Sequence, residues 1–173
     1  MAYARKKRGF TLVEMIIYIA FFALLSSLAV NATLVVMRSF YSLRLTQSIN
    51  ESATTALERM SREIRNAYDY DITQSIFNAN PGQLTLKTKD ASGANTTIKF
   101  YLNPGNQLIL NQGGVDQGSL VTKDVTLTKL IFRPLTTINS KSIKIEATFQ
   151  DTRDLTTQTV NFYDTILLRG SEH

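Results

Sequence analysis

Residues 10–37 form an apolar run in which Glu14 is the only charged side chain, and the run contains neither glycine nor proline. A helix needs about 20 such residues to cross a bilayer, so this run is long enough to span a membrane once. It follows directly on a short basic leader, residues 1–9, whose charges are Arg5, Lys6, Lys7 and Arg8. Positive charge on this side predicts that the N-terminus stays in the cytoplasm and that the rest of the chain is exported.

Glu14 needs a physical explanation, because a carboxylate costs a few kcal/mol at the centre of a bilayer and less near its edge. A helical rise of ~1.5 Å per residue places it about 6 Å from Phe10 along the axis. Cleavage between Gly9 and Phe10 would create an α-amino group with a reference pKa of about 8, which is protonated at neutral pH. The spacing from this group to Glu14 is i,i+4, so the two can meet on one helix. The alternative is an interfacial acid that snorkels towards water without a partner.

The basic leader and the sequence Gly-Phe-Thr-Leu-Val-Glu at residues 9–14 resemble the prepilin signal of type IV pilins and of type II secretion pseudopilins. This resemblance implies cleavage after Gly9 by a prepilin peptidase, N-methylation of Phe10, and assembly into a filament through the hydrophobic helix. In that family the acid at the position of Glu14 serves the N-terminus of a neighbouring subunit. The implied partners are other pilin or pseudopilin subunits, the peptidase, an inner-membrane assembly platform and the lipid bilayer.

Residues 56–67 are similar to the end of the long helix in minor pilins of the W type and pseudopilins of the J type. The resemblance implies a minor subunit of the tip or initiation type. Such a subunit crosses the inner membrane once, with its N-terminus in the cytoplasm, and after assembly lies in a periplasmic or cell-surface filament. The sequence does not distinguish between a pilus, a competence pseudopilus and a secretion pseudopilus as the filament to which the subunit belongs.

Three other interpretations compete with this one. An ordinary secretory signal could be cleaved at the small residues Val30-Asn31-Ala32, so that the protein starts at Thr33. An exported or membrane-tethered β-rich binding module could use the apolar run as a simple signal or anchor. A DNA-binding tip subunit of the competence type would need clustered positive charge. Removing the four leader cations from the formal charge of +5 leaves only about +1, which argues against a nucleic-acid partner.

The fold is predicted to be α+β. Residues 12–70 contain no glycine or proline, which predicts one helix of up to ~59 residues, or about 88 Å. Its second half has apolar residues three and four positions apart, a stripe that predicts a face packed on a core. The stripe consists of Leu45, Ile49, Ala53, Ala56, Leu57, Met60, Ile64 and Ala67.

After residue 71 the apolar pattern alternates, which favours strands of an antiparallel sheet with one face on the helix. Six strands are expected, at residues 83–88, 96–102, 107–110, 125–132, 142–149 and 157–168. We therefore divide the chain into a leader (1–9), a transmembrane or assembly helix (10–37), an amphipathic continuation (38–71) and a β-rich globular domain (72–173).

The sequence shows no catalytic site. It contains no cysteine, and its one histidine is His173, the last residue printed, so a thiolate nucleophile or a Ser-His hydrolase is not expected. No phosphate-binding, zinc or calcium motif is present. We expect no enzyme activity, no metal and no cofactor.

Overall fold

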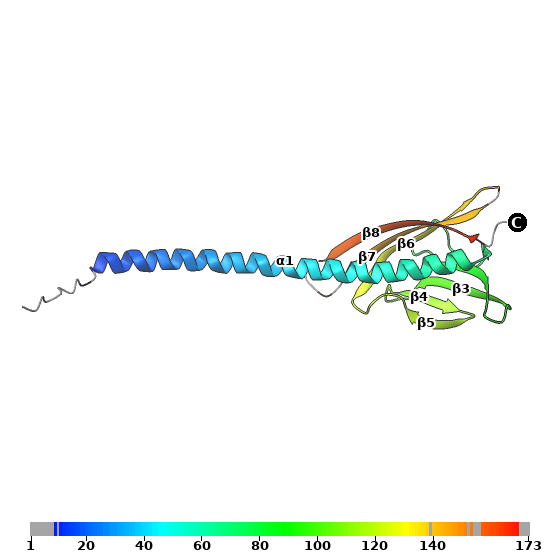
Figure 1. Ribbon diagram of the computed structural model, residues 1–173, viewed down its shortest axis with the longest axis horizontal. Helices are drawn as coiled ribbons and strands as arrows, with labels where there is room; N and C mark the ends of the chain where they lie inside the picture. The colour runs from blue at the N-terminus through cyan, green and yellow to red at the C-terminus, as the bar shows by residue number, and fades with distance from the viewer. Residues whose placement is uncertain (1–8, 10, 139, 152, 154–156, 170–173) are drawn as a thin grey trace, which may run out of the picture. The chain divides into compact units, whose positions relative to one another are not determined.

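The computed structural model describes residues 9, 11–138, 140–151, 153 and 157–169. It divides into two compact units, of which the first ends at Tyr41 and the second begins at Ser42. Helix α1 (Leu12–Asn66) is 55 residues long (Figure 1). Its residues up to Tyr41 belong to the first unit, and its residues from Ser42 onward belong to the second.

The long helix is confirmed, but it ends at Asn66 and not at residue 70 as the sequence predicted. Asp69 and Tyr70 form a short strand, β1 (Asp69–Tyr70), that pairs with residues 86 and 87. The Tyr70 hydroxyl lies 3.0 Å from the Thr136 hydroxyl oxygen, and its ring meets the Phe77 ring edge-on at 5.4 Å. These tertiary contacts outweigh the local helix preference of the segment, as tertiary context commonly does.

The second unit contains two antiparallel sheets, where the sequence had predicted one. The five-stranded sheet has the order β1-β2-β3-β4-β5, and the three-stranded sheet has the order β6-β7-β8. The six predicted strands are confirmed within a few residues, whereas β1 and β5 were not predicted. Their bounds are β2 (Leu84–Lys89), β3 (Asn95–Leu102), β4 (Leu108–Gln112), β5 (Val115–Ser119), β6 (Val125–Thr136), β7 (Lys141–Asp151) and β8 (Gln158–Leu167).

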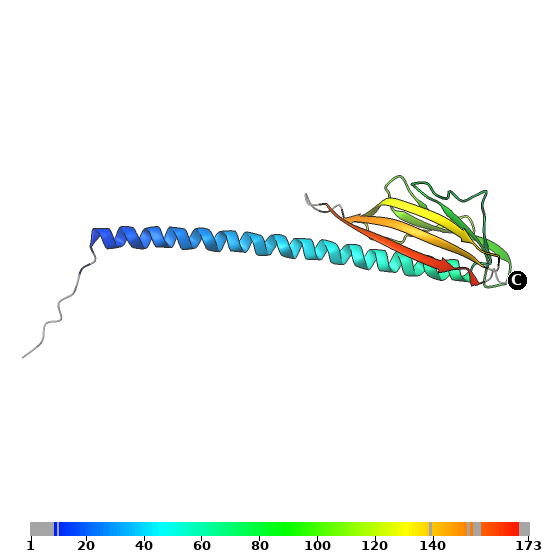
Figure 2. The same ribbon diagram turned by 90° about the horizontal axis from the view of Figure 1, so that it is seen from above.

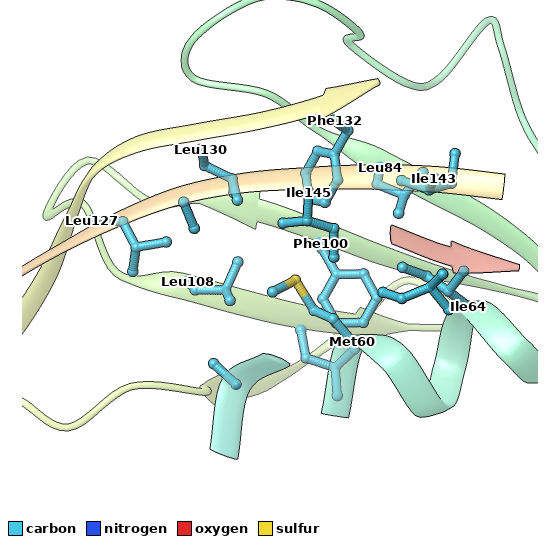
Figure 3. Packing of buried hydrophobic residues seen from close by; sticks show 14 of the residues in the cluster. Met60, Ile64, Leu84, Phe100, Leu108, Leu127, Leu130, Phe132, Ile143 and Ile145 are labelled. Atoms are coloured by element: carbon cyan, nitrogen blue, oxygen red, sulfur yellow. The ribbon is translucent and has the colours of Figure 1, made fainter. Parts of the chain in front are cut away.

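Both sheets curve over one side of the C-terminal half of α1 (Figure 2). The predicted stripe from Leu45 to Ile64 is the buried face of that half, although Leu57 is only partly buried; Ala67, also buried, lies just beyond the end of the helix. Ser52 is also buried in this face. The hydrogen bond between its hydroxyl and the Thr122 hydroxyl, 2.9 Å away, offsets the cost of burying a polar group. Figure 3 shows the resulting cluster, with Met60 and Ile64 of α1 facing side chains from both sheets, including Phe100 of β3 and Ile145 of β7.

Candidate functional site

Thr11 caps the start of α1. Its side-chain oxygen accepts a hydrogen bond from the backbone N–H of Glu14 at 3.3 Å, and its carbonyl accepts the first helical bond from Met15 at 3.2 Å. A threonine cap followed three residues later by glutamate has the spacing of a capping box. The cap satisfies an N–H group that has no partner inside the helix, so α1 begins at Leu12 for a local reason. Our sequence interpretation missed this role of Thr11, although the Thr-x-x-Glu spacing indicates it.

Glu14 lies in the first turn of α1 and is partly exposed. Its Oε1 accepts a hydrogen bond from the Tyr18 hydroxyl, 3.1 Å away and one turn further along the helix. This bond satisfies part of the carboxylate but brings no opposite charge. Tyr18 was also not foreseen as part of the site, although an i,i+4 tyrosine on a helix is within reach of an acid.

Among the residues that the structure describes, Glu14 forms no ion pair. The positive end of the helix dipole favours an acid in the first turn, by about 0.3–1 kcal/mol on an exposed surface. That is less than the cost of a carboxylate in a membrane, so a cation from elsewhere would stabilise Glu14 further. The sequence suggests two sources of such a cation, and both lie outside the described residues. They are the α-amino group of a cleaved Phe10 and the leader side chains of Arg5, Lys6, Lys7 and Arg8.

Gly9 is exposed, and nothing in the described structure requires glycine there. A Cβ atom built on Gly9 would meet no atom within 4 Å. By contrast, a Cβ at Gly82 would lie 2.9 Å from the Leu130 carbonyl oxygen, so that glycine is explained by packing. The described residues therefore give no packing reason for glycine at residue 9.

The N-terminal half of α1 presents apolar side chains on all sides. Within the described residues, α1 is the helix that is long and apolar enough to cross a membrane, by its length and composition. The large exposed side chains include Leu12, Ile16, Ile19, Phe21, Phe22, Leu25, Leu28 and Val35.

Three basic side chains of the second unit surround Glu146 on β7. Arg133 Nε lies 2.9 Å from its carboxylate, Lys144 Nζ 3.2 Å and Lys129 Nζ 3.4 Å. Hydrogen bonds from Arg133, Lys144 and Lys129 outweigh the opposing effect of burial and lower the pKa of Glu146 from 4.5 to about 2. The cluster ties β6 to β7, and its carboxylate stays ionised, so it is a structural ion-pair network.

Asp151, at the end of β7, is almost completely buried, with 1% of its surface exposed. Burial alone would raise its pKa, but hydrogen bonds from the side chain and backbone of Arg153 outweigh this effect and hold the pKa below its ordinary value. The Arg153 guanidinium approaches the carboxylate through Nε and Nη2, the latter at 2.6 Å. A paired carboxylate of this kind stabilises the end of the strand and is not a free acid or base.

No group of three or more histidine or acidic residues that could hold a metal occurs in the described part of the chain. His173 lies outside that part.

Comparison with known proteins adds one finding. Residues 4–30 match the family model of the prokaryotic N-terminal methylation motif, and the match includes the four leader cations, Gly9, Phe10, Thr11 and Glu14. It supports a type IV pilin-like prepilin signal, which implies processing by a prepilin peptidase and assembly with other pilin subunits; proteins with this motif are structural subunits. No curated protein and no solved structure matches the chain.

Proposed function

We propose that this protein is a minor subunit, of the tip or initiation type, of a type IV pilus or a type II secretion pseudopilus. A prepilin peptidase cleaves it after Gly9 and methylates the new N-terminus at Phe10. The N-terminal helix then leaves the inner membrane and packs among the helices of neighbouring subunits. The inner-membrane assembly platform and the lipid bilayer are its other partners, and the globular half ends in the periplasm or on the cell surface.

Glu14 is the observation that carries this proposal. It is an acid without an ion pair among the described residues, in the first turn of an uncovered apolar helix, inside the segment that matches the methylation motif. A membrane anchor alone gains nothing from such an acid. A filament subunit does, because the carboxylate can pair with the N-terminal ammonium group of a neighbour once water and lipid are excluded.

Gly9 supports cleavage at the proposed position. The described structure gives no packing reason for glycine there, and recognition by a peptidase supplies one. The tip or initiation role rests on the resemblance of residues 56–67 to minor pilins of the W type and pseudopilins of the J type.

The cleavage site can be tested with two variants of the full chain, each co-expressed with a prepilin peptidase. Gly9→Val should block processing without disturbing the fold, because a side chain at residue 9 meets nothing within 4 Å. Ala32→Leu should leave processing intact. A secretory signal cut before Thr33 predicts the reverse pattern, with Ala32→Leu blocked and Gly9→Val processed, and that result would refute the proposal.

A further inference from the structure

Among the described residues, no backbone hydrogen bond closes the outer edge of strand β8. The Leu168 N–H donates to the Lys141 carbonyl at 2.9 Å, and the register between β7 and β8 has no bulge. Backbone groups of a strand point alternately to its two sides, so the N–H and C=O groups of Asn161, Tyr163 and Thr165 point away from β7. In the described part of the chain no backbone group pairs with them. Only the Thr165 N–H is occupied, by the Asp164 carboxylate at 2.8 Å.

The other edges of the two sheets are closed or short. The middle of the outer edge of β6 is covered by residues 78–82, whose backbone N–H groups donate to the carbonyls of Leu130 and Phe132 at 2.7 and 3.0 Å. At the ends of the five-stranded sheet, β1 has two residues, and β5 has five and pairs with β4 through a register shift. A long, regular strand edge with unpaired backbone groups is a template for pairing with another chain. Among the described residues, β8 provides such an edge.

A groove of about 460 Å³ runs between the open side of β8 and the flank of α1. Leu57 and Phe162 supply its apolar part. Leu57 is the one member of the helix stripe that the core leaves only partly covered. A strand added to β8 would place alternate side chains over this groove.

The groove carries an excess of positive charge. Arg62, Arg65 and Arg169 line it, against two acids, Glu58 and Asp164. Within the described residues Arg65 and Arg169 form no ion pair, and the carboxylate nearest to Arg62 is Glu63 at 3.7 Å. Glu63 already lies 2.8 Å from Arg59. Arg65 and Arg169, which form no ion pair with the described residues, and Arg62, whose partner Glu63 is shared with Arg59, can each bind a carboxylate through two parallel hydrogen bonds.

From these observations we infer that β8 and the groove bind an extended segment of another protein chain, which adds to the three-stranded sheet as a fourth strand. Its backbone pairs with Asn161 and Tyr163, its apolar side chains cover Leu57 and Phe162, and acidic side chains at alternate positions pair with the arginines. The surface belongs entirely to residues 42–173. It is therefore independent of how the N-terminus is processed.

The test uses the full chain in detergent micelles and a fluorescently labelled peptide of eleven residues, with threonine at odd positions and alternating glutamate and valine at even positions. Two further peptides are matched to it. One has lysine in place of glutamate, and the other is N-methylated at the backbone amides that face β8. Fluorescence anisotropy should show binding of the glutamate peptide and at least tenfold weaker binding of the other two. Equal binding of all three peptides, or no binding of the glutamate peptide, would overturn the inference.

Two pairs of protein variants separate charge from strand pairing. The double variant Arg62→Gln and Arg65→Gln should weaken binding at least tenfold, whereas Lys123→Gln, on an exposed loop, should not. Tyr163→Pro removes one outward N–H and none of the bonds to β7, and proline is tolerated on such an edge. It should abolish binding, while Tyr163→Ala keeps the N–H and should retain it. A different result would also refute the proposed partner: the chain binds no peptide but forms a dimer, and Tyr163→Pro abolishes the dimer. A second copy of the chain would then occupy the edge.

Discussion

The phenol of Tyr18 donates a hydrogen bond of 3.1 Å to Oε1 of Glu14, one turn away on an apolar helix. The bond fixes the direction of the carboxylate but leaves its charge uncompensated within the described residues. If the charge recruits a neighbouring subunit, removing the charge and removing the hydrogen bond should have different consequences.

Glu14→Gln should abolish incorporation into filaments and leave membrane insertion intact. Glutamine keeps an oxygen for the Tyr18 hydroxyl but cannot attract an ammonium group. Tyr18→Phe is the matched control, because it keeps the charge and loses a hydrogen bond worth about 0.5–1.5 kcal/mol. Fractionation of membranes and sheared filaments measures both variants. Normal incorporation of the Glu14→Gln protein would contradict a role for the charge.

Thr11→Ala should fray the first turn of α1. Loss of an N-cap costs about 1 kcal/mol, which corresponds to roughly fivefold faster hydrogen exchange at the backbone N–H of Glu14. Thr33→Ala is the control, since the Thr33 hydroxyl also bonds to the backbone, at the Ala29 carbonyl 2.9 Å away, but in the middle of the helix. Equal exchange at Glu14 in the wild type and in Thr11→Ala would show that Thr11 is not the cap.

The Glu146 network should make the globular half sensitive to acid. The pKa of Glu146 is lowered in the folded protein from 4.5 to about 2. Its ionised form therefore stabilises the fold above pH 4.5, and this stabilisation is lost as the pH falls from 4.5 towards 2. Urea unfolding of the full chain should show that Glu146→Gln is less stable than the wild type at pH 6, and that the difference shrinks towards pH 2.

The exposed carboxylate Glu58 provides the control for that experiment. Glu58→Gln should follow the stability of the wild type throughout, because it removes a negative charge that belongs to none of the ion pairs of the described residues. A constant difference between Glu146→Gln and the wild type from pH 6 to pH 2 would contradict the assignment of the pH dependence to Glu146.

Met60→Ala should destabilise the globular half by about 2–5 kcal/mol, because it leaves a cavity at the centre of the core. Leu57→Ala, three residues earlier on the same helix, should cost clearly less, since Leu57 is only partly buried and borders the groove. Chemical denaturation measures both. Similar losses for the two variants would mean that Leu57 is a core residue.

Parts of this structure could be predicted because local patterns determine them. The helix stripe from Leu45 to Ala67 follows from a spacing of three and four residues, and six strands follow from alternating apolar residues. Strand β5 (Val-Asp-Gln-Gly-Ser) was missed because it is exposed throughout and holds one strong strand former. The end of the helix was placed four residues too late because the pairing of Tyr70 with β2 depends on residues far along the chain.

The candidate site was predictable only in part. Gly9, Phe10 and Glu14 stand out in the sequence because a single acid in an apolar run and a glycine at the end of a basic leader are local signals. Thr11 and Tyr18 also carry local signals, a capping-box spacing and an i,i+4 pair, which our interpretation overlooked. The open edge of β8 could not be predicted, since it depends on the order of the strands and on which segment covers β6.

The central claim is processing at Gly9, and the most direct test is the N-terminal residue and intact mass of the protein recovered from its native membranes. Our account predicts a chain that begins at Phe10 and carries the added mass of one methyl group. A chain that begins at Thr33, or one that still carries residues 1–9 when the peptidase is active, would contradict it.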